Sequence, residues 1–476
     1  MTSRRRRNLS FAAALAAALS ACAVGPDFEP PAPPGVARFT PEEIASPGNG
    51  QRFKEGASVP ARWWTAFGST QLDALIEEAL DRNPTLEAAD AAIRIAQYNA
   101  DAATGAFLPQ VTLNSNSSYQ IYSGDATSST VTQSAYSFFT KQVQISYAPD
   151  IWGGNRRTVE GLEARRDMQG FQKEAAYLTL AADVAKAAIE EASLRAQIAA
   201  TRRIIDLEQQ RLALLELQFA HGAVPGTDIN LQQSALAQAR QTLPDFERRL
   251  AAQRNLLTAL AGRYPSQEVG ETFDLAHIAL PRELPVSLPA GVVAQRPDIK
   301  AAQASVHSAG AQVGVAVAAR LPNVVLTANG GTTAFQLAQL FTPGTGFYAL
   351  AGNIAQPAFD GMTLLNKQKA AEAGLEQAEA QYRDTVIKAF RDVADTLRAL
   401  QSDARAAKET GVAEDAAKKY LDKIRSQLKF GGVSQLAVVD AQRSLLNASI
   451  TRGQAEAQRL TDTVALFVAL GGGWRS

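Results

Sequence analysis

An internal duplication constrains this chain more than any other feature of its sequence. Residues 83–116 align with residues 296–329 without a gap, and both segments contain the pattern Leu-Pro-x-Val-x-Leu. The ends of the two halves agree as well, because Ala259-Leu-Ala-Gly262 matches Ala469-Leu-Gly-Gly472. A duplicated chain builds the same unit twice, so an architecture expected in one half must be reproduced in the other.

Both halves show the same order of patterns: an alanine-rich helix, a strand, a polar turn, a second strand and two long helices. The strands are expected at about 108–122, 138–150, 321–333 and 347–359. In the first half they alternate between apolar and polar residues, with Lys141 as the exception on the apolar face. Such strands, about 9–11 residues long, fit a transmembrane β-barrel, although each one taken alone is better explained as a half-buried strand of a soluble sheet. Two separate hairpins cannot close a barrel in one chain, so several chains would have to combine their strands.

Long stretches without proline predict unusually long helices. Proline is absent from residues 151–224 and from residues 358–476. A helix of about 70 residues would be about 105 Å long, far beyond the three turns of an ordinary globular helix. The helices are expected at about 153–220 and 226–262 in the first half, and at about 361–430 and 434–470 in the second. Heptad spacing along them suits helices packed in a ring, although an antiparallel coiled-coil hairpin explains the spacing slightly better on its own.

Each pair of long helices turns at glycines. Gly222 interrupts the helical pattern in the first half, and Gly431 with Gly432 interrupts it in the second. Glycine can supply the left-handed residue that ends a helix, and Asp228 or Ser434 could cap the helix that follows. Two helical hairpin tips are therefore expected, far along the chain from the strands.

The N-terminus has the pattern of a secretory signal peptide. Four consecutive arginines, Arg4 to Arg7, precede a short apolar stretch that ends in Leu-Ser-Ala, and Cys22 follows. The apolar stretch is too short for a permanent membrane helix, and no later run approaches the roughly 18 residues that such a helix needs. The chain's single cysteine at this point resembles a bacterial lipobox, in which the cysteine is lipidated and becomes the mature N-terminus; the alternative is an ordinary signal peptide followed by a chance cysteine. Ala23 after the cysteine, in place of Asp, favours the outer membrane in that resemblance.

Charge and composition exclude several function classes. The 47 basic and 47 acidic residues leave no basic surplus for nucleic-acid binding, and removal of residues 1–21 shifts the formal net charge from 0 to −4. One cysteine excludes a disulfide framework and paired-cysteine zinc sites. His221, His277 and His307 have no Cys or acidic neighbour at metal-binding spacing, and no phosphate-binding or nucleophile motif is present. No catalytic residue, metal or cofactor is expected, and the chain is not predicted to be an enzyme.

A series of short motifs resembles the outer membrane efflux protein family, of TolC type, and within it the NodT/OprM-like lipoprotein branch. The motifs are Cys22-Ala-Val-Gly-Pro-Asp-Phe28, Trp63-Trp-Thr-Ala-Phe67, Leu108-Pro-Gln-Val111, Tyr147-Ala-Pro-Asp-Ile-Trp-Gly153, Gln295-Arg-Pro-Asp-Ile299, Gln356-Pro-x-Phe-Asp-Gly361, Val438-Val-Asp-Ala-Gln-Arg-Ser-Leu445 and Leu470-Gly-Gly-Gly-Trp474. Their number and order are more specific than any one of them, and they cover essentially the whole mature chain.

The resemblance implies a fold and a function. The fold would be mixed all-α plus transmembrane β, in a trimer whose chains each give four strands to a shared twelve-stranded barrel. A long periplasmic α-helical barrel with an equatorial domain would continue it. The function would be the passive exit duct of a tripartite efflux pump, joined through a periplasmic adaptor protein to an inner-membrane transporter, expected to be of the RND type.

The resulting division of the chain has six segments. They are a signal peptide at 1–21, a lipid-anchored linker and equatorial segment at 22–82, a first repeat at 83–262, an inter-repeat equatorial segment at 263–295, a second repeat at 296–472 and a C-terminal tail at 473–476. The adjacent Trp63 and Trp64 precede the first repeat, so they are expected to pack in the equatorial region and not in a membrane belt.

The resemblance also implies site residues. A periplasmic constriction would be formed by Leu436 and Asp440, which lie at i and i+4 on one helix face, so that a trimer would carry an apolar ring and an acidic ring. Gly222, Gly431 and Gly432 would mark the tips at which the adaptor docks. Two alternatives stay open: the outer-membrane component of a type I protein secretion system, and a lipid-anchored coiled-coil scaffold with no pore.

Overall fold

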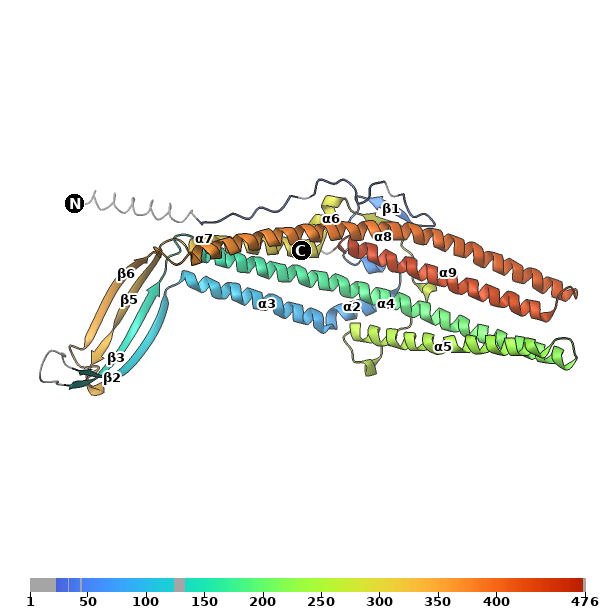
Figure 1. Ribbon diagram of the computed structural model, residues 1–476, viewed down its shortest axis with the longest axis horizontal. Coiled ribbons are helices and arrows are strands. Elements are labelled where there is room, and N and C mark those ends of the chain that lie inside the picture. The colour runs from blue at the N-terminus through green and yellow to red at the C-terminus, as the bar shows by residue number, and fades with distance from the viewer. Residues whose placement is uncertain (1–22, 33, 43–44, 124–132, 474–476) are drawn as a thin grey trace. The chain divides into compact units, whose positions relative to one another are not determined.

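The computed structural model describes residues 23–32, 34–42, 45–123 and 133–473 (Figure 1). Cys22 and the expected signal peptide lie outside the described residues. The chain divides into two compact units, which are treated separately below. Unit 1 takes its described residues from 1–31, 92–169 and 302–382, and unit 2 from 32–91, 170–301 and 383–476.

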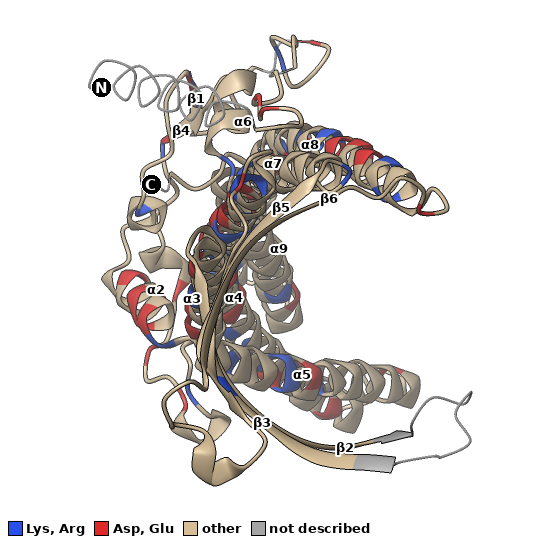
Figure 2. Cartoon of the chain, turned by 90° about the vertical axis from the view of Figure 1, so that its left-hand side faces the viewer, with Lys and Arg blue, Asp and Glu red and all other residues tan. Residues whose placement is uncertain are grey.

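Unit 1 contains a four-stranded antiparallel sheet. Its strands are β2 (Gln110–Ser123), β3 (Gln133–Tyr147), β5 (Asn323–Ala334) and β6 (Gly346–Ala355), and they are hydrogen-bonded in the order β2-β3-β5-β6. The sheet is strongly curved, and among its four strands only β3 carries a charged residue, Lys141 (Figure 2). β3 ends at Tyr147, not at the expected residue 150, because Pro149 has no N–H to continue the ladder.

Helices α3 (Pro84–Thr104) and α7 (Pro297–Ala318) precede the two hairpins. Both begin with proline, which suits the first turn of a helix because the missing N–H would have no partner there. The strands β2 and β5 follow these helices at nearly equal distances along the chain, so each half supplies one helix and one hairpin.

The long helices come in two pairs of matching length. Helices α4 (Gly154–Ala220) and α8 (Thr363–Lys429) each have 67 residues, and α5 (Gly226–Leu260) and α9 (Gln435–Ala469) each have 35. None of the helices in the described part of the chain has an apolar stretch long enough to cross a membrane.

The main hydrophobic core lies in unit 2. Trp63 and Trp64, in the short helix η1 (Trp63–Phe67), are each 1% exposed, and Trp63 stacks on Phe467 of α9 with ring centroids 5.4 Å apart. Helix α2 (Thr70–Arg82) buries its apolar face in the same core. Both tryptophans are therefore buried in the core of unit 2 and do not lie on a surface that could face lipid, while their place in an equatorial region stays a prediction.

Unit 2 also contains a small sheet that the sequence did not predict. Strand β1 (Arg52–Glu55) pairs in parallel with β4 (Glu283–Val286), and the short helix α6 (Pro289–Gln295) follows β4. The pairing ties the segment before the first repeat to the segment between the repeats.

Left-handed glycines end the two long helices α4 and α8, as predicted. Gly222 has φ 72° and Gly431 has φ 71°. The N–H of Ala223 donates to the Gln218 carbonyl, and the N–H of Gly432 donates to the Gln427 carbonyl, each at 2.9 Å, which satisfies carbonyls that the helix end leaves free.

The predicted side-chain caps of the following helices are wrong. Ser434 stands at the N-cap of α9, but its side chain makes no capping hydrogen bond. Pro225, and not Asp228, is the N-cap of α5. Asp228 lies in the first turn, where a carboxylate is stabilised by the helix dipole without capping a particular N–H.

Candidate functional site

The two residues expected to form a constriction lie on α9, near the tip that joins it to α8. Leu436 and Asp440 are one helical turn apart and both are partly exposed. The Asp440 carboxylate forms an ion pair with the Arg211 guanidinium of α4. In the first half the equivalent positions are Thr227 and Leu231, so the duplication supplies no second acidic residue there.

A second ion pair joins the same two helices one turn further along. The buried Glu208 carboxylate of α4 accepts a 2.9 Å hydrogen bond from Nη1 of Arg443 on α9. It also accepts a 2.5 Å hydrogen bond from Nε2 of Gln232 on α5. Because Glu208 is only 3% exposed, removal of either donor would leave a buried carboxylate incompletely paired, which is costly.

Helices α4 and α9 are therefore linked by two ion pairs, and each helix supplies the acidic residue of one pair and the basic residue of the other. Asp440 of α9 is paired with a base on α4, and Glu208 of α4 is paired with a base on α9. Nε of Arg211 is buried and has no hydrogen-bond partner among the described atoms, so one buried donor of these four charged residues is left without an acceptor. We call Glu208, Arg211, Asp440 and Arg443 the α4–α9 charge cluster.

Sequence reasoning found one member of this cluster and missed three. Asp440 was found from the motif that it belongs to. Arg211, Glu208 and Arg443 belong to helices that are remote in sequence, and heptad spacing shows which face a residue occupies but not which side chain on another helix it meets.

The helical tips carry apolar side chains in solvent. Phe430, next to Gly431 and Gly432, is 87% exposed, and Leu217 and Phe219, just before Gly222, are 59% and 50% exposed. Each tip therefore exposes large apolar side chains, and the docking of an adaptor at the tips stays a prediction.

Among the described residues, no three or more His, Cys, Asp and Glu side chains are grouped so that they could hold a metal ion. His307 has a structural partner, with Nε2 at 2.9 Å from Oε1 of Glu160. Cys22 lies outside the described residues, so its lipidation stays a prediction.

Comparison with known proteins places the chain in a family. A sequence profile of the outer membrane efflux proteins matches residues 75–263 and, separately, residues 288–472. The chain belongs to the outer membrane efflux protein family. The two matched blocks of the efflux protein profile correspond to the two halves of the duplication.

Relatives within the efflux protein family match over nearly the whole chain. The pyoverdine export outer membrane protein OpmQ of Pseudomonas putida is 30% identical over 453 residues, which is 94% of each chain. The probable outer membrane lipoprotein SilC of Salmonella typhimurium is 26% identical over 461 residues, which is 96% of each chain. The open state of the MtrE outer membrane channel of Neisseria gonorrhoeae is similar in structure with a TM-score of 0.81 at 25% identity, covering 95% of this chain and 98% of that chain. The mixed helical and β fold predicted from the sequence is confirmed by this similarity.

Proposed function

We propose that three copies of this chain form the outer-membrane exit duct of a tripartite efflux pump. The duct would conduct small molecules passively from a periplasmic adaptor and an inner-membrane transporter, of RND type, to the exterior, and would carry out no chemistry of its own. Membership of the outer membrane efflux family supports the location and the transport role. The names of OpmQ, an export protein, and MtrE, a channel, point in the same direction.

The observation that carries the proposal is a sheet with two free edges and an exposed apolar face. Strands β2 and β6 each pair on one side only among the described residues. On one face, paired neighbours are Leu113 with Val143 and Val111 with Ile145, and Leu113 is 79% exposed. A long free edge beside exposed apolar side chains is unfavourable in water, and pairing β2 of one copy with β6 of the next, within a membrane, removes both problems.

Native mass spectrometry in mild detergent tests the assembly. Protein extracted from outer membranes is expected to have the mass of three chains. A monomer that remains soluble and folded in the absence of detergent would contradict a membrane-inserted sheet shared between copies.

We further propose that the α4–α9 charge cluster holds the periplasmic end of the duct closed. Leu436 would form an apolar ring that excludes solutes, and Asp440 would form an acidic ring that favours cations. The ion pairs of Asp440 and Glu208 oppose movement of α9 away from α4, so opening requires both to be broken or exchanged.

Vancomycin entry tests this closure. Asp440→Ala and Arg443→Ala each remove one ion pair and are expected to increase vancomycin sensitivity in cells at an unchanged trimer level. Asp422→Ala, which removes an exposed carboxylate of α8 outside the cluster, is the matched control. Equal sensitivity in all three variants and the wild type would show that the charge cluster does not close the duct.

A lipid anchor at Cys22 is the last part of the proposal. The lipobox-like Leu-Ser-Ala-Cys sequence supports it, and SilC is named a probable lipoprotein. Labelling with palmitate is expected for the wild type and not for Cys22→Ser. Incorporation of label into Cys22→Ser would place the anchor elsewhere.

A further inference from the structure

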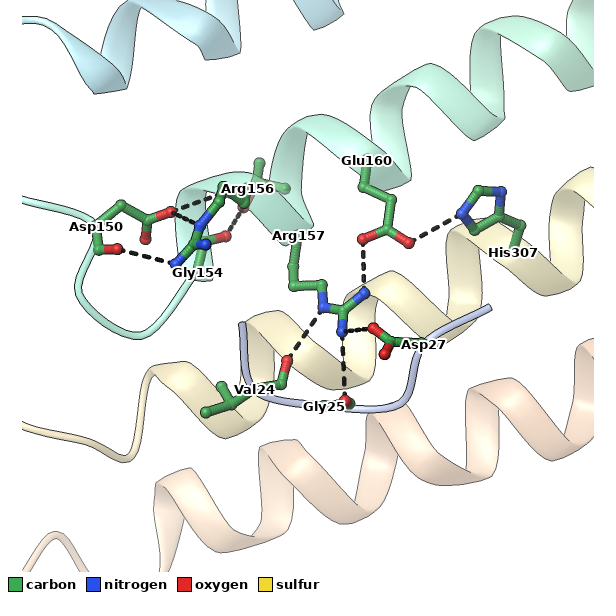
Figure 3. A network of polar contacts seen from close by, with 10 residues as sticks. Val24, Gly25, Asp27, Asp150, Gly154, Arg156, Arg157, Glu160 and His307 are labelled. Atoms are coloured by element: carbon green, nitrogen blue, oxygen red, sulfur yellow. Dashed lines mark hydrogen bonds and ion pairs between the residues drawn. The ribbon is translucent and has the colours of Figure 1, made fainter. Parts of the chain in front are cut away.

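The Arg157 guanidinium of α4 contacts three of the first residues after Cys22 (Figure 3). Arg157 Nε donates to the Val24 carbonyl at 3.1 Å, and Nη2 donates to the Gly25 carbonyl at 3.3 Å and to the Asp27 carboxylate at 2.6 Å. Nη1 donates to the Glu160 carboxylate at 2.8 Å. The Arg157 side chain is only 5% exposed, and its guanidinium hydrogen bonds go to this short N-terminal segment and to the Glu160 carboxylate.

Backbone contacts complete the site. The Val24 N–H donates to the Trp152 carbonyl at 3.1 Å, so both polar groups of the Val24 backbone are paired. Gly25 has φ 94°, and a Cβ at this position would overlap the backbone of Gly314 on α7. The backbone of the N-terminal segment therefore passes so close to α7 that both residues at the crossing, Gly25 and Gly314, must lack a side chain.

An aromatic contact closes the far end of the site. Phe28 stacks on the His307 imidazole, with ring centroids 4.1 Å apart and planes inclined by 15°. His307 in turn is 2.9 Å from the Glu160 carboxylate, which also accepts from Arg157. The segment Ala23–Phe28 is thus bound by hydrogen bonds, an ion pair and a ring stack, all within unit 1.

The fold of the repeat does not require this cluster. Helix α4 and its duplicate α8 have equal lengths, and the residues of α8 that correspond to Arg157 and Glu160 are Asn366 and Lys369. A cation in the first turn of a helix is also unfavourable, because the helix dipole places positive charge there. The presence of an arginine at position 157 is better explained by its contacts with the N-terminal segment, which has no counterpart in the second half of the chain.

We infer that the Arg157 site is a receptor for the chain's own N-terminal segment and that it fixes the level at which the lipid anchor enters the membrane beside the four-stranded sheet. The inference rests on the proposed lipidation of Cys22, which directly precedes Ala23. If residues 23–31 were not bound to the protein, this stretch could extend to about 30 Å, which is as long as the hydrocarbon core is thick. The lipid anchor would then have no fixed position along the membrane normal. With Val24 and Gly25 bound, the anchor is held one or two residues from α4.

Spin labelling of Glu29→Cys tests the site directly. Because lipidation blocks the thiol of the only native cysteine, Cys22, the introduced thiol is the single reactive one. In outer-membrane preparations the label is expected to be immobilised in the wild-type background, mobile with Arg157→Ala and immobilised with the control Arg166→Ala. Arg166 is on the same helix and pairs with Asp167 and Gln97.

Assembly is measured in the same strains. Palmitate incorporation is expected to be unchanged in Arg157→Ala, whereas trimers recovered from the outer membrane fall about tenfold relative to Arg166→Ala, because several charge-assisted hydrogen bonds are lost. A milder variant, Asp27→Asn, removes only the ion pair with Arg157, at a side chain that is 93% exposed. It is expected to fold even if Arg157→Ala does not, and to make the label at position 29 partly mobile.

Two results would overturn the inference. One is an immobile label in both Arg157→Ala and Asp27→Asn, and the other is an unchanged trimer yield in Arg157→Ala with a mobile label. A failure of the proposed duct would be visible separately, as an absence of trimers in the wild type.

Discussion

Two acidic side chains, Asp403 of α8 and Asp462 of α9, lie close together in unit 2. Burial raises the pKa of Asp403 to about 7. The neighbouring Asp462 carboxylate acts in the same direction, because it accepts a hydrogen bond from protonated Asp403 and repels the ionised form, whereas the charge of Arg459 acts in the opposite direction. Arg459 is 3% exposed and is itself occupied by Gln51 and by the carbonyls of Gly48 and Asn49, so it cannot fully neutralise the pair.

This pair predicts a pH-dependent stability. Because the pKa of Asp403 is higher in the folded state than its ordinary value of 3.8, its contribution to stability is full below the ordinary pKa and is lost as the pH rises towards about 7. Asp403→Asn is expected to leave the Tm almost unchanged below about pH 4, and to raise it by an amount that grows with pH and levels off above about pH 7. Thermal unfolding of purified trimers across this range measures the difference, with Asp422→Asn as the control. Parallel Tm profiles for Asp403→Asn and the wild type would contradict the assignment.

At the scale of residues, the sequence identified positions but not partners. The lipobox-like motif pointed to Cys22, and a family motif pointed to Leu436 and Asp440. The pairing of Asp440 with Arg211 depends on how two helices from different halves meet, which no local pattern encodes. The docking of Val24 and Gly25 on Arg157 was missed for the same reason.

At the scale of elements, both 35-residue helices contain a poor helix former at the same place. Pro244 lies inside α5, and Gly453 occupies the corresponding position of α9. Proline removes a helical hydrogen bond and glycine costs backbone entropy, so each helix is weakened at the same distance from its tip.

Gly453→Ala is expected to stabilise the protein by about 1 kcal/mol, since an added Cβ meets no other atom there. Pro244→Ala is expected to stabilise it more, by up to about 3 kcal/mol, because a backbone hydrogen bond is restored. Denaturant unfolding of the detergent-solubilised protein gives both values. A lower stability of Gly453→Ala would mean that the glycine serves a close contact absent from a single chain.

The exposed tips lead to a prediction about the partner protein. Phe430→Asp is expected to abolish export, measured as loss of resistance to a pump substrate, while the amount of trimer stays the same, because the substitution places a charge on the surface proposed for the adaptor. Tyr264→Asp is the control, since Tyr264 is an exposed aromatic residue of unit 2 outside the tips. Full resistance in Phe430→Asp would exclude this tip from docking.

Long elements were predictable and short ones were not. Proline-free stretches indicated the long helices α4, α8 and α9, and alternation indicated the hairpins, because each pattern repeats over many residues. Helix α5 contains Pro244 and was expected from the duplication. The parallel pairing of β1 with β4 joins strands of four residues each, distant in sequence, and four residues are too few to show a period.

At the scale of the whole molecule, one chain supplies a sheet that needs neighbours. Within the described part of the chain, the outer strands β2 and β6 each have one unpaired edge, and apolar side chains of the sheet are exposed in a single copy. The duplication explains why the strands arrive as two hairpins, and it predicted from sequence that several chains must contribute. It did not show how many, which came only from the family resemblance.

Single-channel recording tests the central claim most directly. Purified wild-type trimers and Asp440→Ala trimers are inserted into planar lipid bilayers at equal protein amounts. The account predicts cation-selective channels that are mostly closed in the wild type, and channels with weaker cation selectivity that are open far more often in Asp440→Ala. Trimers of both proteins that insert into the bilayer and carry no current would contradict a duct closed by the α4–α9 charge cluster.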